Sequence, residues 1–419
     1  MQRAWGGKHF KCMAKILISF VGTGRRNKDE KAKREYETAS YILNGRVLKN
    51  YSFVSLALAD TIKPDKVFLI GTVHSMWEEV YSKFCHRNNI PMDEAIWGEV
   101  GDYCDKANSQ SELSFPHKED VEKAMGEGSL ISLIRYGITE DEIQENINII
   151  LKLKNKIKAG DEIIVDITHS FRSLPLYIMQ LMMYLKTIDK NITISHVYYG
   201  MYEAAENRGP APIVDLVSII NVNDWIIGAY AFQNYGNATK VAELMEKENK
   251  SVSTLLQNFS DAMNLNHIMA INSQIQRLSG IKNTEYKSKI ADLIITPSIE
   301  KFTNEFRNKE KATFELRLAE WQAQHHNYTA AYISIVESMV TYTCIINKLN
   351  DESYDDREKA KDIIRGKISG KCDTLIATEF PKLNKIRNSL AHSIETVKNL
   401  NSMIITLHEG IIKIKEIIK

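Results

Sequence analysis

Four short apolar segments, three of which lead into loops of small and hydroxylated residues, constrain the first half of this chain more than any other feature. They are rich in β-branched residues, and stretches with helical periodicity separate them, one starting at the capping box Thr139-x-x-Glu142. We expect strands at residues 14–21, 66–70, 162–167 and 192–199. Strands that alternate with helices form mostly parallel sheets, and ligands bind beyond the carboxyl ends of such strands. The first half therefore predicts a doubly wound, mostly parallel α/β domain.

The strand signals stop after about Asn221. Residues 224–419 show helical periodicity almost throughout, with long apolar stretches near residues 329–349 and 396–418. Breaks in the pattern fall at residues 283–284, 351–352 and 380–381. This half predicts an all-α helical bundle. Because 419 residues exceed one ordinary hydrophobic core, we expect four parts: an N-terminal extension at residues 1–12, an α/β domain at 13–220, a helical connector at 221–310 and a terminal bundle at 311–419.

The composition argues against several classes of protein. A formal net charge of only +1 gives no basic face that could coat nucleic acid, so RNA or an anionic ligand would be bound through local clusters. The five cysteines are scattered, and the adjacent His325 and His326 point to different faces of a helix, so we expect no metal site and no cofactor. The sequence contains no run of about 18 apolar residues, the length that would suggest a membrane span. Residues 1–12 lack the apolar core of a signal peptide, so we expect a cytoplasmic protein.

The loops after three of the expected strands share one composition. They contain Gly22, Thr23, Gly24, Arg25 and Arg26 in the first loop, Gly71, Thr72, Ser75, Met76 and Trp77 in the second, and Asp166, Thr168, His169, Ser170 and Arg172 in the third. Amides at helix N-termini, hydroxyls and arginines bind phosphates, and Met76 or Trp77 can flank a base. Turn-forming glycines and capping hydroxyls explain any single loop, but three such loops at matching strand ends favour one ligand site.

Three segments that contain these loops, residues 18–24, 69–77 and 166–175, resemble the CARF domain of CRISPR-associated effector proteins. The resemblance covers about residues 13–220 and implies a Rossmann-like fold. It also implies a homodimer whose two CARF domains form one pocket for cyclic oligoadenylate, a second messenger made by type III CRISPR complexes. The hydroxyls and His169 around the bound ring raise a second interpretation, in which the pocket also cuts its own activator. Binding alone explains these residues equally well.

The expected terminal bundle contains an arginine and a histidine five positions apart, Arg387 and His392. That spacing alone is a weak signal. The apolar stripe of this helix leaves Asn388 and His392 off the core; it consists of Leu383, Ile386, Leu390, Ile394 and Val397. Arg-x4-His in this setting resembles the HEPN ribonuclease motif, over about residues 310–419. The resemblance implies that Arg387, Asn388 and His392 are catalytic, with Glu337 as a supporting acidic residue.

These residue types suit RNA cleavage without a metal. RNA carries its own nucleophile, the 2′-hydroxyl, so no metal-bound water is needed. An imidazole moves protons near neutral pH, and a guanidinium stabilises charge on the phosphate oxygens. On a regular helix Arg387 and His392 point about 140° apart. Either the helix is irregular there, or two subunits contribute to one cleft, which is what the resemblance favours.

Together these patterns predict a CRISPR-associated CARF–HEPN endoribonuclease for antiviral defence. Cyclic oligoadenylate would act as the allosteric activator of a homodimer, or of a higher oligomer of dimers, that cuts single-stranded RNA and leaves 2′,3′-cyclic phosphate ends. One alternative is a CARF-gated DNA nuclease, which would need metal-binding carboxylates on a sheet. The other is a non-enzymatic regulator or adaptor, which would need a compact helix-turn-helix. We see neither pattern in the sequence.

Overall fold

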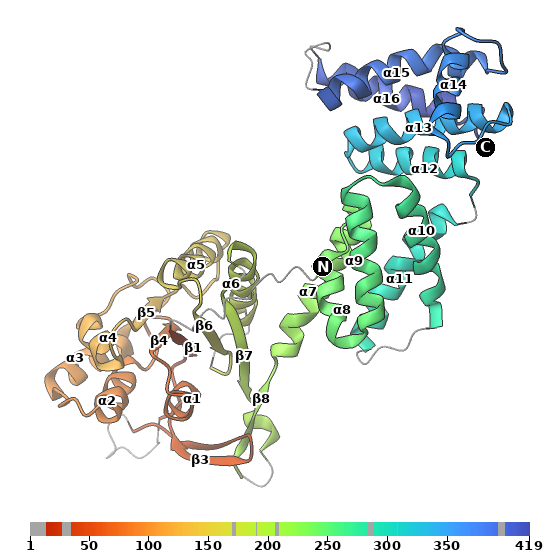
Figure 1. The fold of residues 1–419 in the computed structure, drawn as a ribbon. Helices are drawn as coiled ribbons and strands as arrows, with labels where there is room; N and C mark the ends of the chain where they lie inside the picture. The colour runs from red at the N-terminus through yellow and green to blue at the C-terminus, as the bar shows by residue number, and fades with distance from the viewer. Residues whose placement is uncertain are drawn as a thin grey trace. The chain divides into compact units, whose positions relative to one another are not determined.

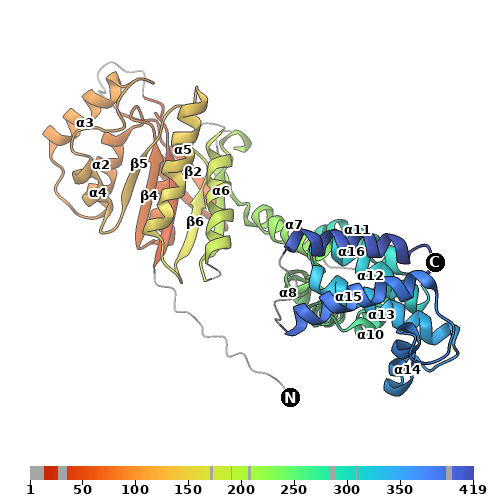
Figure 2. The same ribbon diagram turned by 90° about the horizontal axis from the view of Figure 1, so that it is seen from above.

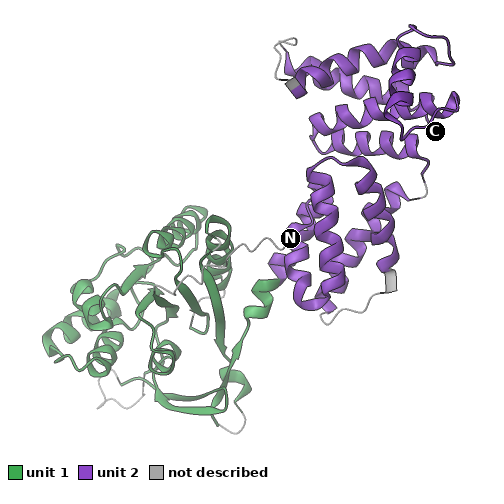
Figure 3. Cartoon of the chain, viewed as in Figure 1, with its two compact units in different colours: residues 1–221 green, residues 222–419 purple. Residues whose placement is uncertain are grey.

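The computed structural model describes residues 14–419 except for 27–34, 170–172, 190, 206–208, 284–288, 308 and 393–398. The chain divides into two compact units, residues 1–221 and residues 222–419 (Figure 3). The division falls within helix α7 (Val217–Tyr235). Each unit has its own hydrophobic clusters, so each is described by itself.

The described part of unit 1 is built around an eight-stranded sheet with the order β3-β2-β8-β7-β6-β1-β4-β5 (Figure 1). The strands are β1 (Lys15–Val21), β2 (Ala39–Leu43), β3 (Arg46–Tyr51), β4 (Lys66–Gly71), β5 (Leu130–Leu133), β6 (Glu162–Asp166), β7 (Thr193–Gly200) and β8 (Ala211–Asp215). The pairs around β1 are parallel, and β2–β3 and β7–β8 are antiparallel. Strand β1 pairs in parallel with β4 on one side and with β6 on the other, which makes the carboxyl end of β1 a topological switch point.

Helices cover both faces of this sheet (Figure 2). They are α1 (Val54–Ile62), α2 (Trp77–Arg87), α3 (Glu94–Lys106), α4 (Lys118–Met125), α5 (Glu140–Lys152) and α6 (Leu174–Ile188). Leu17 and Leu69 belong to one core with α1, α2 and α4. Their neighbours Ile16 and Phe68 point to the opposite face, into a second core with α5 and α6. The predicted doubly wound, mostly parallel sheet is therefore confirmed.

Four of the described strands, β2, β3, β5 and β8, were not predicted, and of these β2 and β3 matter most for the site. They form a hairpin whose turn residues, Asn44 and Gly45, both have positive φ angles, 51° and 77°. Asn-Gly is the preferred pair for such a turn. At the start of α5, half of the expected capping box is present, since the Thr139 side chain accepts a hydrogen bond from the Glu142 amide (3.3 Å). The Glu142 carboxylate accepts from the amides of Gly137 and Ile138 instead of that of Thr139.

Unit 2 is helical, as predicted. Beyond α7 its helices are α8 (Thr239–Glu248), α9 (Lys250–Asn264), α10 (Ile268–Ser279), α11 (Lys289–Phe306), α12 (Lys311–Gln324), α13 (Tyr328–Ile346), α14 (Tyr354–Ile364), α15 (Thr374–His392) and α16 (Leu400–Ile414). Helix α12 has apolar residues on two sides. Phe314 and Leu318 pack with α7–α11, whereas Leu316 and Ala319 pack with α13–α16. One helix thus joins two cores.

The predicted break at residues 380–381 is wrong. Helix α15 continues through Pro381, although proline removes one backbone hydrogen bond from a helix interior. The flanking Phe380 and Leu383 are 1% and 0% exposed, and their burial in the bundle core holds the helix together across the proline. By contrast, residues 351–352 form a turn between α13 and α14, as predicted.

Helix α13 is long and apolar enough to cross a membrane by composition. Yet 67% of its most apolar stretch is buried within the structure. It contributes Tyr332, Ile335 and Met339 to the core shared with α15 and α16. Burial of this kind is typical of the central helix of a bundle.

Candidate functional site

Two cavities open at the carboxyl ends of the central strands of unit 1, where the switch point lies. They measure about 330 and 260 Å³ and share Gly22, Thr168 and His169 in their walls. We name the larger the β4-side cavity and the smaller the β2-side cavity. The β4-side cavity is lined by Val21, Gly22, Thr23, Gly71, Thr72, Ser75, Thr168, His169 and Leu174. All three predicted loops therefore meet at one edge of the sheet.

The β2-side cavity takes Gly24, Arg25 and Met76 from the predicted set. The rest of its wall was not predicted: one group of residues lies in or beside the unpredicted β2–β3 hairpin, and the other lies at the end of the predicted strand β7 and just after it. This wall includes Glu37, Thr38, Ala39, Tyr41, Ser52, Tyr199, Gly200, Tyr202 and Glu203. Carboxylates repel phosphates but accept hydrogen bonds from amino and hydroxyl groups. The two cavities thus differ in chemistry: backbone and hydroxyl groups dominate the β4 side, and carboxylates and tyrosines the β2 side.

Hydrogen bonds between the first two loops fix the shape of the β4-side cavity. The Ser75 hydroxyl donates to the Val21 carbonyl (2.7 Å), and the Met76 amide donates to the Gly22 carbonyl (3.0 Å). Gly71 allows this close approach, because a Cβ there would lie 2.8 Å from both the Val21 carbonyl oxygen and the Ser75 hydroxyl. At Gly22, by contrast, a Cβ would meet nothing within 4 Å. Gly71 is needed for packing, and Gly22 faces open space.

Asp166 positions the third loop and does not line either cavity. Its fully buried carboxylate accepts hydrogen bonds from the Ser19 hydroxyl (2.5 Å), the Thr168 hydroxyl (2.5 Å) and the Thr168 amide (3.0 Å). The Thr168 hydroxyl in turn accepts a hydrogen bond from the Gly200 amide (2.8 Å). Burial raises the pKa of Asp166, whereas these hydrogen bonds favour its charged form. The sequence predicts Asp166 as a ligand residue, but its place in the structure is behind Thr168.

His169 is the imidazole that both cavities share. Its Nε2 atom is buried and has no hydrogen-bond partner in the described part of the chain. Burial lowers the pKa of this imidazole, against the opposing effect of Asp166, and so favours the neutral ring. A buried nitrogen without a partner at a cavity wall is suited to a polar group of a ligand. The predicted Ser170 and Arg172 lie outside the described residues.

Two predicted residues turn away from the cavities. The indole of Trp77 is 0% exposed, stacks on Phe115 at a centroid distance of 5.6 Å and donates a hydrogen bond to the Thr72 carbonyl (2.9 Å). It is a core residue and cannot flank a base. The Arg26 guanidinium contacts Asp105 (2.5 Å) and Glu78 (3.3 Å), and the hydrogen bond with Asp105 raises its pKa. Arg26 therefore fastens the first loop to α2 and α3, while Arg25 lines the β2-side cavity.

The predicted catalytic residues of unit 2 lie on α15. The Arg387 guanidinium donates hydrogen bonds to the Asn388 side chain (2.9 Å) and to Glu337 Oε1 on α13 (3.3 Å). The structure therefore brings together Arg387, Asn388 and the suggested acidic partner. His392 is the last residue of α15, and its side chain lies outside the described part of the structure. Because α15 is continuous, residues 387 and 392 point about 140° apart around its axis.

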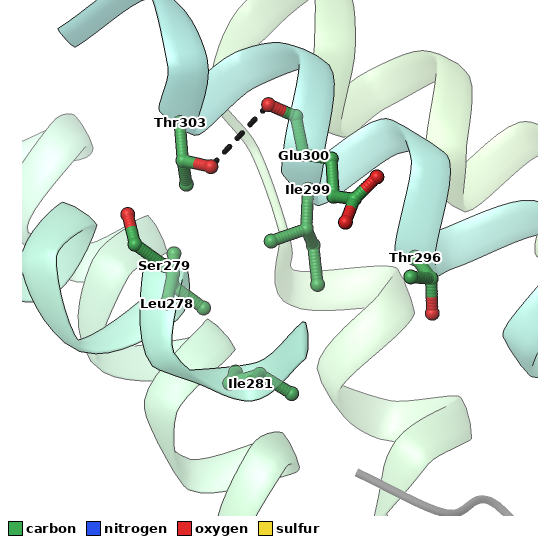
Figure 4. Close-up of a pocket in the computed structure, with 7 residues that line it drawn as sticks. All are labelled: Leu278, Ser279, Ile281, Thr296, Ile299, Glu300 and Thr303. Carbon is green, nitrogen blue, oxygen red and sulfur yellow. Dashed lines mark hydrogen bonds between the residues drawn. The ribbon is translucent and has the colours of Figure 1, made fainter. Parts of the chain in front are cut away.

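A further pocket in unit 2 has no room for an organic ligand. It lies between α10 and α11 and is lined by Leu278, Ser279, Ile281, Thr296, Ile299, Glu300 and Thr303 (Figure 4). Its volume of about 10 Å³ is close to the smallest that holds one water molecule. Among the described residues, no group of three or more histidine, cysteine, aspartate or glutamate side chains is placed to hold a metal ion.

Comparison with known proteins identifies the first unit. Residues 16–203 match the family described as the CARF domain of the CRISPR system endoribonuclease Csx1. The first unit contains a CARF domain of the kind found in CRISPR-associated proteins. Both cavities lie within the matched region. Residues 221–311 match the second domain of the CRISPR-associated protein MJ1674.

One relative extends this comparison over most of the chain. The chain is 32% identical to the CRISPR-associated protein MJ1674 of Methanocaldococcus jannaschii over 401 residues, which cover 91% of this chain and 62% of that protein. The chain thus spans less than two thirds of the length of this relative. A solved structure of Enterococcus italicus Csm6 bound to cyclic hexa-2′-fluoro-hexa-dAMP is 13% identical, with a TM-score of 0.40, over 96% of this chain and 94% of the Csm6 chain.

Proposed function

We propose that this CARF protein is an endoribonuclease, activated when cyclic oligoadenylate binds the CARF domain and cutting single-stranded RNA with the bundle at residues 311–419. The observation that carries the proposal is the contact of Arg387 with Glu337 and Asn388 in a chain whose first unit is a CARF domain. Support also comes from the matched CARF family, which is named after an endoribonuclease. No metal or cofactor takes part in the proposed reaction.

The chemistry follows from the residue types. The 2′-oxygen of RNA attacks the adjacent phosphorus, and the 5′-oxygen of the next nucleotide leaves, which gives a 2′,3′-cyclic phosphate and a 5′-hydroxyl. Arg387 stabilises the charge on the phosphate oxygens, and Asn388 orients its guanidinium. His392 transfers the proton from the 2′-hydroxyl to the leaving oxygen. Since one regular helix does not present Arg387 and His392 on one face, we assign the cleft to two subunits of a homodimer.

The activator is assigned to the two cavities of the CARF domain. The β4-side cavity, with Thr23, Thr72 and exposed backbone around Gly22, suits phosphates, and the β2-side cavity suits the amino groups of adenine. Binding of the ring shifts the equilibrium between the inactive and active conformations of the protein only by as much as the ring binds the active conformation more tightly. The link to a type III CRISPR complex would be this second messenger. Whether His169 also cuts the ring is measured by following activator integrity during RNA cleavage.

One experiment tests the proposal against both alternatives. Labelled RNA and DNA of the same sequence are incubated with the full chain in excess EDTA and, in parallel, with a divalent ion, each with and without cyclic oligoadenylates. We expect cleavage of RNA alone, only with activator, and 2′,3′-cyclic phosphate ends. Cleavage of DNA, or a strict need for a divalent ion, would indicate the nuclease alternative. Activator binding without cleavage of either strand would indicate a regulator or adaptor.

A further inference from the structure

A connected row of polar side chains runs behind Arg387 through four helices of unit 2. Glu337 on α13 accepts a hydrogen bond from Arg387 with Oε1 and contacts Arg357 of α14 with Oε2. Arg357 also donates to the hydroxyl of Thr341 on α13 (3.1 Å). Glu315 of α12 lies at the end of this row, near enough to the Thr341 hydroxyl and the Arg357 guanidinium for both to favour its charged form. A buried carboxyl group thus lies behind the proposed catalytic arginine, with the side chains of Thr341, Arg357 and Glu337 between them.

Arg357 lies deeper in the bundle than Arg387 and is more firmly held. The side chain of Arg357 is 18% exposed, compared with 30% for Arg387. A third hydrogen bond joins Arg357 to the Asp351 carbonyl (2.9 Å). The two oxygens of Glu337 are therefore divided between two guanidiniums. One carboxylate cannot neutralise two cations, so Arg387 keeps positive charge that a phosphate can use.

Glu315 can change this balance. It is 4% exposed, its Oε2 atom has no hydrogen-bond partner in the described part of the chain, and burial raises its pKa to about 7. The charged groups that act on it are Arg357, Glu337 and Lys311. On the other helices packed against α12, Lys413 of α16 pairs with Glu379, and Lys415, the C-cap of α16, pairs with Glu320. Lys301 and Glu305 of α11 are exposed.

We propose that Arg357 and Glu315 are positioning residues that set how much positive charge Arg387 presents to the RNA phosphate, an inference that rests on the proposed function. With Glu315 protonated, Arg357 holds Glu337 by one oxygen and Arg387 shares only the other. With Glu315 ionised, Arg357 is shared between two carboxylates. Glu337 is then free to pair more closely with Arg387 and to compete with the phosphate. Cleavage therefore falls as the pH rises through the ionisation of Glu315.

The pH profile of activator-saturated RNA cleavage tests the role of Glu315. His392 also titrates, so the informative quantity is the difference between the wild type and Glu315→Gln, which mimics the protonated state. We expect Glu315→Gln to lose most of the decline in kcat/KM between about pH 6 and 8. The control is Glu320→Gln, a half-buried glutamate on the same helix that pairs with Arg317 and Lys415, which should keep the wild-type profile. Identical profiles for Glu315→Gln and the wild type would overturn the proposal.

Arg357 is tested by substitution with a matched arginine control. Arg357→Gln should lower kcat/KM roughly tenfold at about pH 6, with partial recovery in Arg357→Lys. Arg365→Gln, at the C-cap of the same helix, should stay close to the wild type. An unchanged rate in Arg357→Gln would refute its positioning role.

A second measurement separates this proposal from the proposed function. Titration of carbon-13-labelled glutamate followed by NMR reports the ionisation of Glu315 without any cleavage. We expect a pKa well above the ordinary glutamate value of about 4.3, and a further rise in Arg357→Gln because a nearby cation is lost. If the wild type cuts no RNA, the proposed function fails. If Glu315 titrates like an exposed glutamate, the positioning role of Glu315 and Arg357 is refuted, whereas the proposed function is not.

Discussion

The two candidate sites of this protein differ in the kinds of groups that form them. In the CARF domain, small residues and backbone dominate the β4-side cavity, where the hydroxyls of Ser75 and Thr168 are already used in hydrogen bonds that hold the loops. In the helical bundle, the site is a row of charged side chains around Arg387. A site of the first kind depends on shape, so added volume harms it. A site of the second kind depends on charge, so neutral substitutions and pH harm it.

The largest expected effect is the loss of cleavage when the charge of the second site is removed. Arg387→Ala should lower RNA cleavage by at least about a hundredfold, because it removes stabilisation of the phosphate charge. His392→Ala should do the same through loss of proton transfer. Both variants should bind cyclic oligoadenylate like the wild type, which a direct binding titration checks.

The control for this loss is Arg365→Ala, which removes an arginine from the neighbouring helix terminus without touching the motif. Retention of more than a few per cent of activity in Arg387→Ala or His392→Ala would contradict the HEPN assignment. Loss of activator affinity in either variant would show instead that the substitution disturbs the CARF domain.

The next largest effect tests whether the CARF site depends on shape, by adding volume at two glycines. Gly71→Val should destabilise the CARF domain by about 3 kcal/mol or more, since the new side chain meets the Val21 carbonyl oxygen at 2.8 Å. Gly22→Val should leave the free energy of unfolding close to that of the wild type, because its Cβ meets nothing within 4 Å, but should fill the cavities. Chemical denaturation gives the stabilities, and an activator titration of RNA cleavage gives the affinity.

The pair is decisive because the two positions differ only in what surrounds them. A Gly22→Val variant that responds to activator like the wild type would show that the ligand site has been misplaced. Equal destabilisation by both substitutions would show that Gly22 also serves packing.

A smaller effect concerns stability and pH in the second site. The pKa of Glu315 is raised to about 7 in the folded protein from an ordinary value of 4.5. A carboxyl group with a raised folded pKa stabilises the fold most below its unfolded pKa, and this contribution is lost as the pH rises through the folded pKa. Between about pH 4.5 and 7, unit 2 should therefore lose on the order of 3 kcal/mol of stability, which Glu315→Gln should retain.

Hydrogen exchange of the amides of α12 and α13 measures this loss within unit 2. Glu320→Gln is the control, because the pKa of Glu320 is lowered by its contacts with Lys415 and Arg317, against the effect of burial. A pH dependence in Glu315→Gln equal to that of the wild type would assign the loss to other groups.

Local sequence patterns predicted most of the central strands and the helices of unit 2. The features that they did not predict depend on packing between residues far apart in the sequence. Strands β1, β4, β6 and β7 and the helices of unit 2 follow from apolar periodicity, which neighbouring residues determine. The β2–β3 hairpin was missed, although Asn44 and Gly45 carry its signal, because its strands are short and mostly polar on one face. Helix α15 continues through Pro381 because of contacts with other helices, which periodicity does not reveal.

The candidate site shows the same division. Parallel topology brings strand-end loops together, so the location of the cavities could be predicted. Which of two adjacent side chains faces a cavity could not, since Trp77 turns into the core against Phe115, whereas Met76 lines the β2-side cavity. The choice depends on a residue from a distant loop.

The smallest expected effect separates Arg25 from Arg26, adjacent arginines in the first loop. Arg25 lines the β2-side cavity, so Arg25→Ala should raise the activator concentration needed for half-maximal cleavage about tenfold, as one charge-assisted hydrogen bond is lost. Its free energy of unfolding should not change. Arg26 is bound to Asp105 and Glu78 instead, so Arg26→Ala should cost about 1 kcal/mol of stability or less and weaken activation only by loosening the loop. Arg26→Lys keeps the positive charge but not the planar guanidinium that contacts both carboxylates. Its free energy of unfolding should therefore lie between those of the wild type and Arg26→Ala. If Arg26→Ala weakens activation more than Arg25→Ala at unchanged stability, then Arg26 leaves its carboxylates to bind the ring, and the CARF site depends on charge as the bundle site does.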